Sequence, residues 1–329
     1  MEKISDKTKT KRKHPFIVGC SAFFKGNTWK NIVNHKALYL FLLPAIVLIA
    51  VFCYAPMFGL VIAFQDYRLS EGVGGSEFIG FKMFYKILFS PDSASYLEFR
   101  NTVYISLLRI ATNFPVILVF TLLLNEIKNK RAKGFVQAVS YIPYFISWIS
   151  VGGIAYNLFA VDGGILNNLL ALFGKEPITW YSESKYWWGI LTISSLWKGM
   201  GWATLIYISG LGAIDTELYD ACKIDGGGRF RQMISVTVPG LMNVIMLQLI
   251  LDVGGIMSDN YDQILAMING SQSLDSVTRV VGTLEYEAII NGSQYSKATA
   301  YGLLRGVIGM ALVVMTNKII KKTDNEGIL

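Results

Sequence analysis

The chain has 329 residues, of which 53% are hydrophobic and 16% are charged. This charge content is too low for a typical soluble protein, because globular domains carry about 25% charged residues. The formal net charge of +7 would suit a nucleic-acid ligand, but the placement of the basic residues argues against one.

Residues 1–36 form a basic tail ahead of the first apolar run. The part at 1–15 is charged and predicts a disordered segment. The part at 16–36 mixes aromatic side chains with lysines, which is typical of a segment on the inner membrane surface. The apolar run that follows is too long for a signal-peptide core, so we expect it to stay uncleaved. We therefore divide the chain into a cytoplasmic tail, 1–36, and a transmembrane domain, 37–329.

Six apolar runs are long enough to cross a bilayer as helices, which takes about 20 residues each. We therefore predict an all-α polytopic membrane protein. The predicted spans are 37–64, 99–124, 135–160, 187–212, 239–266 and 299–320.

The basic residues lie mainly on one side of this arrangement. Of the 30 lysines and arginines, 19 fall in the tail, the loop after the second span, the loop before the fifth span and the C-terminal end from Lys318 on. This asymmetry places both termini in the cytoplasm, so the charge reflects topology and we expect no nucleic-acid partner. The two histidines, His14 and His35, lie in the tail, and we expect no metal site.

The loop at 213–238 is polar and charged, although it joins two apolar spans. It includes most of the stretch ELYDACKIDGGGRFRQMISVTVP, Glu217 to Pro239. Asp215 or Thr216 can cap a first helix by accepting from its unpaired N–H groups. The glycines at 226–228 permit the positive-φ turn that ends this helix, and apolar residues then recur at helical spacing. We predict two short helices around a glycine hinge, forming a surface for docking another protein.

The residue order in this loop resembles the "EAA" coupling loop of ABC importer permeases. The matching residues are Asp220, Ala221, Cys222, Gly226, Val238 and Pro239. Asp220 stands where the family usually has Glu, and Cys222 stands where it usually has a second Ala. The plain alternative is an ordinary amphipathic loop helix.

Other stretches resemble the sugar-uptake permeases, and specifically their complex-oligosaccharide or polysaccharide branch. They cover most of the chain from residue 36 in the expected order. They are YAPMFGLVIAFQDY (54–67), FIGFKMFYKILF (78–89), YIPYFISWISVGGIAYNLF (141–159), DGGILNNLL (162–170) and QYSKATAYGLLRGVIGMALVVMTNKI (294–319).

The resemblance implies a six-helix subunit of a type I ABC importer in the bacterial cell membrane. Such a subunit pairs with a second permease and sits on two copies of a cytoplasmic ATPase. An extracellular solute-binding lipoprotein delivers the sugar. The nearest match to a phosphate loop is at Gly174-Lys175. Leu169 stands where the first glycine of the motif belongs, and Glu176 stands where the motif needs a serine or threonine, so the chain shows no phosphate loop of its own. We expect no bound cofactor on this chain and no catalysis, with ATP and Mg on the partner ATPase.

Our hypothesis is that the loop at 213–238 couples the permease to the ATPase. Asp220 would fix the loop or contact the ATPase, Gly226 would provide the turn, and Phe230 or Met233 would supply apolar packing. Arg229, like Arg231, could instead meet anionic lipid headgroups.

The translocation path is predicted from polar and aromatic residues inside the spans. Ionisable groups at membrane depth are costly unless they line a cavity or find a partner. Tyr144 and Trp148 would lie one helical turn apart on one face, and Asp252 precedes glycines that can break the fifth helix. Each side chain could equally serve packing. The candidates are Asn113, Tyr144, Trp148, Trp197, Lys198, Trp202, Asp252, Asn260 and Tyr261.

Other functions stay open at this point. An importer of another solute, such as a peptide or amino-acid derivative, would share the coupling loop. An ion-coupled secondary carrier would need no docking loop and would show inverted repeats more often. A membrane-anchored sensor would need a soluble domain, and no segment is long enough to be one.

Overall fold

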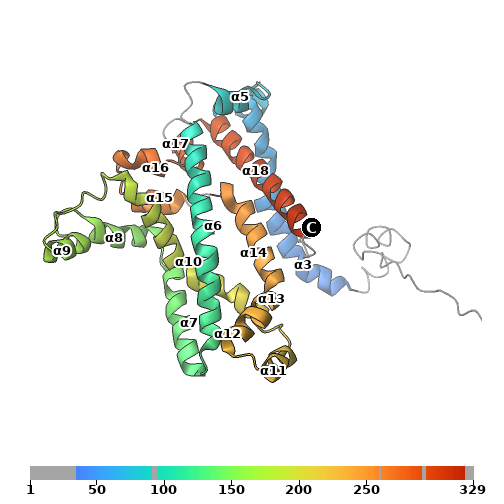
Figure 1. Ribbon diagram of the computed structural model, residues 1–329. Helices are drawn as coiled ribbons and strands as arrows, with labels where there is room; N and C mark the ends of the chain where they lie inside the picture. Colours follow the sequence, from blue (N-terminus) through green and yellow to red (C-terminus); the bar gives the residue numbers. More distant parts are fainter. Residues whose placement is uncertain (1–34, 91–94, 259–260, 291–293, 323–329) are drawn as a thin grey trace, which may run out of the picture. The chain divides into compact units, whose positions relative to one another are not determined.

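The computed structural model describes residues 35–90, 95–258, 261–290 and 294–322 (Figure 1). The chain divides into two compact units, Met1–Leu60 and Val61–Leu329. The described part of the first unit belongs to one apolar helical run, whose last residues, 61–64, are counted with the second unit. It starts as α3 (Lys36–Ile49), passes through the π-helical η1 (Ala50–Tyr54) and continues as the 3-10 helix η2 (Ala55–Phe64).

The second unit is almost entirely helical. Its two short strands, β1 (Gln65–Asp66) and β2 (Glu77–Phe78), pair antiparallel with Gln65 opposite Phe78. Its helices are α4 (Gly72–Gly75), α5 (Lys82–Phe89), α6 (Ser95–Glu126), α7 (Lys130–Phe145), α8 (Trp148–Phe159), α9 (Ile165–Leu172), η3 (Ser184–Tyr186), α10 (Trp187–Leu211), α11 (Thr216–Ile224), α12 (Arg229–Gln232), η4 (Met233–Thr237), α13 (Val238–Gly240), α14 (Met242–Gly254), η5 (Gly255–Met257), α15 (Tyr261–Met267), η6 (Gln272–Leu274), α16 (Asp275–Thr278), α17 (Val281–Ile290) and α18 (Tyr295–Lys321).

Among the described residues, three helical runs are long and apolar enough to cross a membrane: Lys36–Phe64, Ser95–Glu126 and Tyr295–Lys321. The number rises to five if each of two bent helix pairs counts as one span. The predicted fourth span corresponds to α10, whose 25 residues would extend roughly 37 Å at 1.5 Å per residue. That length is sufficient, but polar residues such as Lys198 make α10 less apolar than the others.

The third predicted span, 135–160, is not the single straight helix that its apolar pattern suggested. The axes of α7 and α8 are bent by 96° at the break between them. Pro143 lies in the last turn of α7, Ile146 is extended with ψ 133°, and the Ser147 hydroxyl caps α8 by accepting from the Ser150 N–H. Proline removes a backbone donor and a new cap starts a new helix. Tyr144 therefore lies on α7 and Trp148 on α8, and the prediction that they share one helical face is wrong.

The fifth predicted span, 239–266, also ends earlier than expected. The helix α14 stops at Gly254, as its glycine pair suggested, and a 3-10 turn completes it at Met257. The Ser106 hydroxyl donates to the carbonyl of Ile256 at 2.8 Å and Arg305 Nε donates to that of Met257 at 2.9 Å, so the freed carbonyls are satisfied. Tyr261 belongs to the separate helix α15. Asn260 lies outside the described residues.

The long helices of the second unit pack in two groups. The helix α10 packs against α6 and α7, and α14 packs against α18 (Figure 1). A Cβ added at Gly201 would collide with the backbone carbonyl of Ser140, so glycine permits the close approach of α10 to α7. Separate buried clusters lie towards the two ends of α6, one around Leu122 and Tyr207 and the other around Ile87 and Tyr301.

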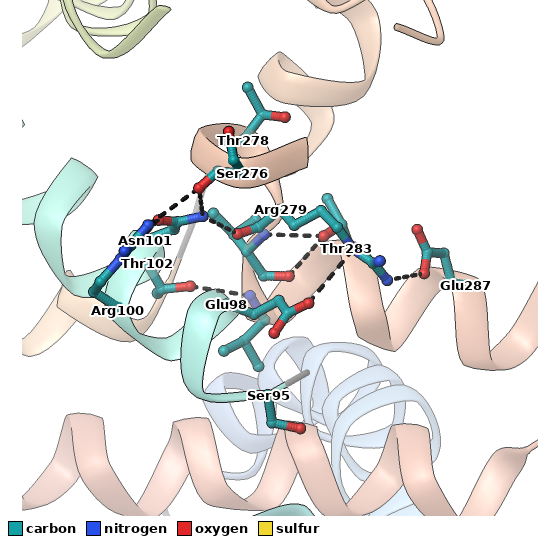
Figure 2. Close-up of polar contacts among 12 residues, drawn as sticks. Ser95, Glu98, Arg100, Asn101, Thr102, Ser276, Thr278, Arg279, Thr283 and Glu287 are labelled. Atoms are coloured by element: carbon teal, nitrogen blue, oxygen red, sulfur yellow. Dashed lines mark hydrogen bonds and ion pairs between the residues drawn. The ribbon is translucent and has the colours of Figure 1, made fainter. Parts of the chain in front are cut away.

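A buried polar network fixes the first turns of α6 against α16 and α17 (Figure 2). Glu98 is 0% exposed, and its Oε1 lies 3.4 Å from Nε of Arg279. The Asn101 amide donates to the carbonyls of Ser276 and Arg279, at 3.2 and 2.9 Å. The Thr102 hydroxyl accepts from the Val281 N–H at 3.0 Å. Since Arg279 also pairs with the more exposed Glu287 at 2.7 Å, it balances a buried charge on one side and a half-exposed one on the other.

We predict that Arg279→Met lowers the thermal unfolding midpoint of the purified protein markedly, because it leaves Glu98 buried without its cation. Breaking a buried pair in this way costs about 3–5 kcal/mol. Adding Glu98→Gln to Arg279→Met should recover most of the loss. The control, Glu287→Gln, removes the exposed partner of the same arginine and should change the midpoint little. Equal losses for Arg279→Met and Glu287→Gln would contradict the assigned role of Glu98.

Candidate functional site

The loop after α10 folds as the sequence predicted, into two short helices around a glycine. The Asp215 carboxylate caps α11 by accepting from the Glu217 N–H at 2.9 Å. The helix ends at Ile224, and Gly226 adopts φ +76°. The Gly226 N–H then donates to the Lys223 carbonyl at 3.0 Å and the Gly227 N–H to that of Cys222 at 2.8 Å. These bonds close the end of α11 and direct the chain into α12.

The loop presents apolar side chains to its surroundings. Phe230 is 70% exposed and Ile224 is 86% exposed, and Leu218 is exposed as well. Met233 differs, because it packs against the buried cluster that contains Leu122 and Tyr207. The loop therefore combines an inward anchor with an outward apolar surface, and an exposed apolar patch of this kind marks an interaction site.

The charged residues of the loop have different surroundings. Asp220 pairs with Lys223 at 2.8 Å on the exposed side of α11, and an exposed pair of this kind contributes little to stability. Arg229 lies 3.6 Å from Glu126, the last residue of α6. The loop is therefore connected to the end of α6 opposite the network of Figure 2. Pro239 lies in α13, where the loop joins the fifth span.

A second group of predicted residues meets at the break between α7 and α8. Lys198, near the middle of α10, donates to the carbonyls of Pro143 at 3.3 Å, Tyr144 at 2.7 Å and Ile146 at 2.5 Å. Among the described residues, the Tyr144 and Ile146 carbonyls have no backbone partner where α7 ends, whereas the Pro143 carbonyl also accepts from the Ile146 N–H at 3.2 Å. The ammonium also matches the negative end of the helix dipole. Lys198 is thus the cap of a broken helix.

Aromatic rings surround this cap. The ammonium of Lys198 lies 5.5 Å from the ring centre of Tyr144 and 5.4 Å from that of Trp148, distances that suit cation–π contacts. Trp202, one turn further along α10, stacks on Tyr144 with ring centres 4.5 Å apart and planes 5° from parallel. The structure therefore brings Tyr144, Trp148, Lys198 and Trp202 together. Trp197 is 44% exposed, and among the described residues no ring contact places it in this group.

The remaining path candidates divide between a polar cavity and α15. The cavity has a volume of about 340 Å³ and lies between α6, α10 and α14. Arg109, Asn113 and Asp252 all line it, and Gln248 donates to Asp252 at 2.9 Å. Tyr261 lies elsewhere, with its ring 6.4 Å from that of Tyr286 on α17. A polar cavity among membrane helices can hold the hydroxyl groups of a hydrophilic solute.

Several residues of these sites were not predicted from the sequence. Ser195, Tyr207 and Gln248 line the cavity. Their positions within three helical turns of Lys198 or Asp252 were the available signal. The carbonyls that Lys198 caps could not be found from side-chain identity, because they exist as acceptors only where the helix breaks.

The family of this chain follows from its similarity to known proteins. The family model described as "binding-protein-dependent transport system inner membrane component" matches residues 113–317. This match includes most of the residues that line the polar cavity, the capped helix break and the loop with Gly226. The chain belongs to this family of membrane transport components.

Two curated relatives from Bacillus subtilis are similar over nearly the whole permease chain. The polygalacturonan/rhamnogalacturonan transport system permease protein YteP is 36% identical, covering 91% of this chain and 92% of its own. Protein LplB is 35% identical, covering 92% and 95%. Among solved structures, a chain of a bacterial alginate ABC transporter in complex with an alginate pentasaccharide-bound periplasmic protein matches with a TM-score of 0.81 and 26% identity. That match covers 92% of this permease and all of the other chain. The ABC importer permease fold expected from the sequence is thereby confirmed.

We predict that Lys198→Met destabilises the permease, because the Tyr144 and Ile146 carbonyls lose their donor and the Pro143 carbonyl keeps only the Ile146 N–H. An unsatisfied buried polar group costs about 1–3 kcal/mol, so the thermal midpoint in detergent should fall by several degrees. Lys198→Arg should retain most of the stability, since it keeps the charge and the donors.

The matched control is Lys185→Met, which removes an exposed lysine that pairs with Glu183. Its midpoint should stay near that of the wild type. A Lys198→Met protein as stable as the Lys185→Met control would show that the cap contributes nothing measurable.

Proposed function

We propose that this chain is one of two permease subunits of an ATP-driven importer for an oligosaccharide or a polysaccharide-derived glycan. The second subunit would be a similar permease. Two copies of a cytoplasmic ABC ATPase would bind ATP and Mg, and an extracellular binding lipoprotein would deliver the glycan. The observation that carries the proposal is the combination of near-full-length similarity to a permease named for polygalacturonan and rhamnogalacturonan with the exposed apolar surface on the coupling loop.

The coupling loop is the proposed contact with the ATPase. Phe230, on α12, is exposed and would fill an apolar depression on the ATPase. Asp220 and Ala221 would contribute to the docking face from α11, and Cys222 and Gly226 would set the turn behind it. Arg229 would transmit displacement of the loop to α6 through Glu126. This arrangement requires both termini and the loop to face the cytoplasm, which agrees with the excess of basic residues there.

The polar cavity and the capped break are the proposed parts of the translocation path. Arg109, Asn113 and Asp252 line a cavity wide enough for hydroxyl groups. The stacked rings of Tyr144 and Trp202 are each partly exposed and offer apolar faces to the C–H surfaces of a sugar. A permease for a peptide or amino-acid derivative is the alternative, and the glycans named in the relatives favour a sugar.

The first experiment is a mild-detergent pull-down of the chain from its native membrane, read by mass spectrometry. We expect an ABC ATPase, a second permease and a binding lipoprotein to be recovered together. Recovery of the chain alone or as a homodimer, with the same result after crosslinking, would overturn ATP-driven import and favour a secondary carrier.

We predict that Gly226→Val reduces recovery of the ATPase and lowers glycan uptake at least about tenfold, while the amount of permease in the membrane stays unchanged. Gly226 adopts φ +76°, and a β-branched residue is a strong outlier at positive φ.

The control is Gly228→Ala two residues later. Gly228 has φ −70°, and a Cβ there would meet nothing within 4 Å, so uptake should be normal. Unimpaired uptake in the Gly226→Val protein would refute the role of the turn.

A further inference from the structure

A polar cleft lies at the end of α6 opposite the coupling loop. Its volume is about 600 Å³, and its walls come from β1, α5 and the first turns of α6 and α18. Since α6 has 32 residues and would extend roughly 48 Å, the cleft is far from Glu126 and the loop. In the proposed topology it faces the outside, where the glycan arrives.

Hydrogen bonds hold the walls of the cleft together. The Tyr67 N–H donates to the Ser296 hydroxyl at 2.9 Å, and the Ser95 and Tyr301 hydroxyls are 2.8 Å apart. Tyr67 packs edge-on against Tyr295, with ring centres 5.9 Å apart. Ser95 begins the helix that Glu98 and Arg279 anchor one turn later (Figure 2). The cleft is thus built on a fixed part of the second unit.

Two lysines supply most of the charge in this cleft. Lys86 on α5 and Lys297 on α18 both line it. Within the described ranges, neither ammonium lies within ion-pair distance of a carboxylate. Lys297 lies 5.9 Å from the ring centre of Tyr301. Among the lining residues that the structure describes, the one carboxylate is that of Asp66, which lies 3.9 Å from Arg68.

We infer that this cleft binds an acidic glycan, with a uronate carboxylate held by Lys86 and Lys297. Two ammonium groups provide charge-assisted donors for a carboxylate. Asp66 and Gln294 can accept from sugar hydroxyls, and Tyr67 offers a ring face. This inference rests on the proposed function and extends it, because it specifies the charge of the glycan and adds a site away from the cavity at membrane depth.

A glycan fits this cleft better than the two other sources of an anion. Small-molecule sites are concave, with volumes of roughly 300–1,000 Å³, and the cleft falls in this range. An acidic side chain of a docking protein would need two ammonium groups but no hydroxyl acceptor. A lipid phosphate would likewise leave Asp66 without a role, whereas a uronic acid has both a carboxylate and hydroxyls.

The test compares the uptake of two probes by the assembled importer in proteoliposomes of neutral lipid. One probe is a short oligogalacturonide, and the other is the same oligosaccharide with its carboxylates reduced to alcohols. The double variant Lys86→Gln with Lys297→Gln should raise KM for the acidic probe at least about tenfold, as expected when charge-assisted hydrogen bonds are lost. Its KM for the reduced probe should not change.

The matched control is Lys82→Gln, which removes a lysine of α5 that does not line the cleft. Both probes should then behave as with the wild type, and Lys86→Arg with Lys297→Arg should keep the preference for the acidic probe. An equal rise of KM for both probes in the double Gln variant would show that the lysines serve protein docking or lipid binding, and it would overturn the inference. Uptake of the reduced probe alone by the wild type would overturn it too, leaving the proposed function in place. If neither probe is taken up and a panel of other glycans also fails, the proposed function fails as well.

Discussion

The structure of this permease depends on satisfying backbone groups where its membrane helices break. In hydrocarbon each carbonyl without a donor costs several kcal/mol, so irregular backbone survives only where a side chain replaces the lost helical bond. Lys198 does this for the end of α7, and Ser106 and Arg305 do it for the end of α14. These polar side chains therefore permit the third span to bend and the helix of the fifth span to end at Met257. The break between α7 and α8 in turn brings Tyr144 and Trp148 beside Lys198 of α10.

The same constraint changes how intramembrane charges are interpreted. An ionisable residue inside a span suggests a contact with solute. Lys198 shows a second use, because its ammonium donates to three carbonyls and has no donor left for another acceptor. Its role in transport would be to position Tyr144 and Trp202. The polar cavity lined by Arg109, Asn113 and Asp252 is then the better candidate for direct contact with solute hydroxyls.

Much of this architecture could be predicted from the sequence, for reasons that are local. Capping by Asp215 and the turn at Gly226 depend on the chemistry of a few consecutive residues, and both form as expected. The bend between α7 and α8 was missed because its apolar pattern runs through Pro143 without interruption. What stabilises the bend is a lysine more than fifty positions away in sequence. The cleft around Lys86 and Lys297 was missed for the same reason, since its walls come from segments about two hundred residues apart and no single stretch shows a binding pattern.

The helix α6 offers a mechanical connection between these sites. One end contacts the coupling loop through Glu126 and Arg229, and the other is fixed to α16 and α17 by Glu98, Asn101 and Thr102. Its middle lines the polar cavity. The end near the loop also packs in the buried cluster with Leu122 and Met233. Because apolar contacts are non-directional and an exposed ion pair is weak, this end should shift more readily than the end held by directional buried polar contacts. Displacement of the coupling loop would then alter the cavity more than the cleft, so that a site for an arriving glycan could persist while the path beneath it opens and closes.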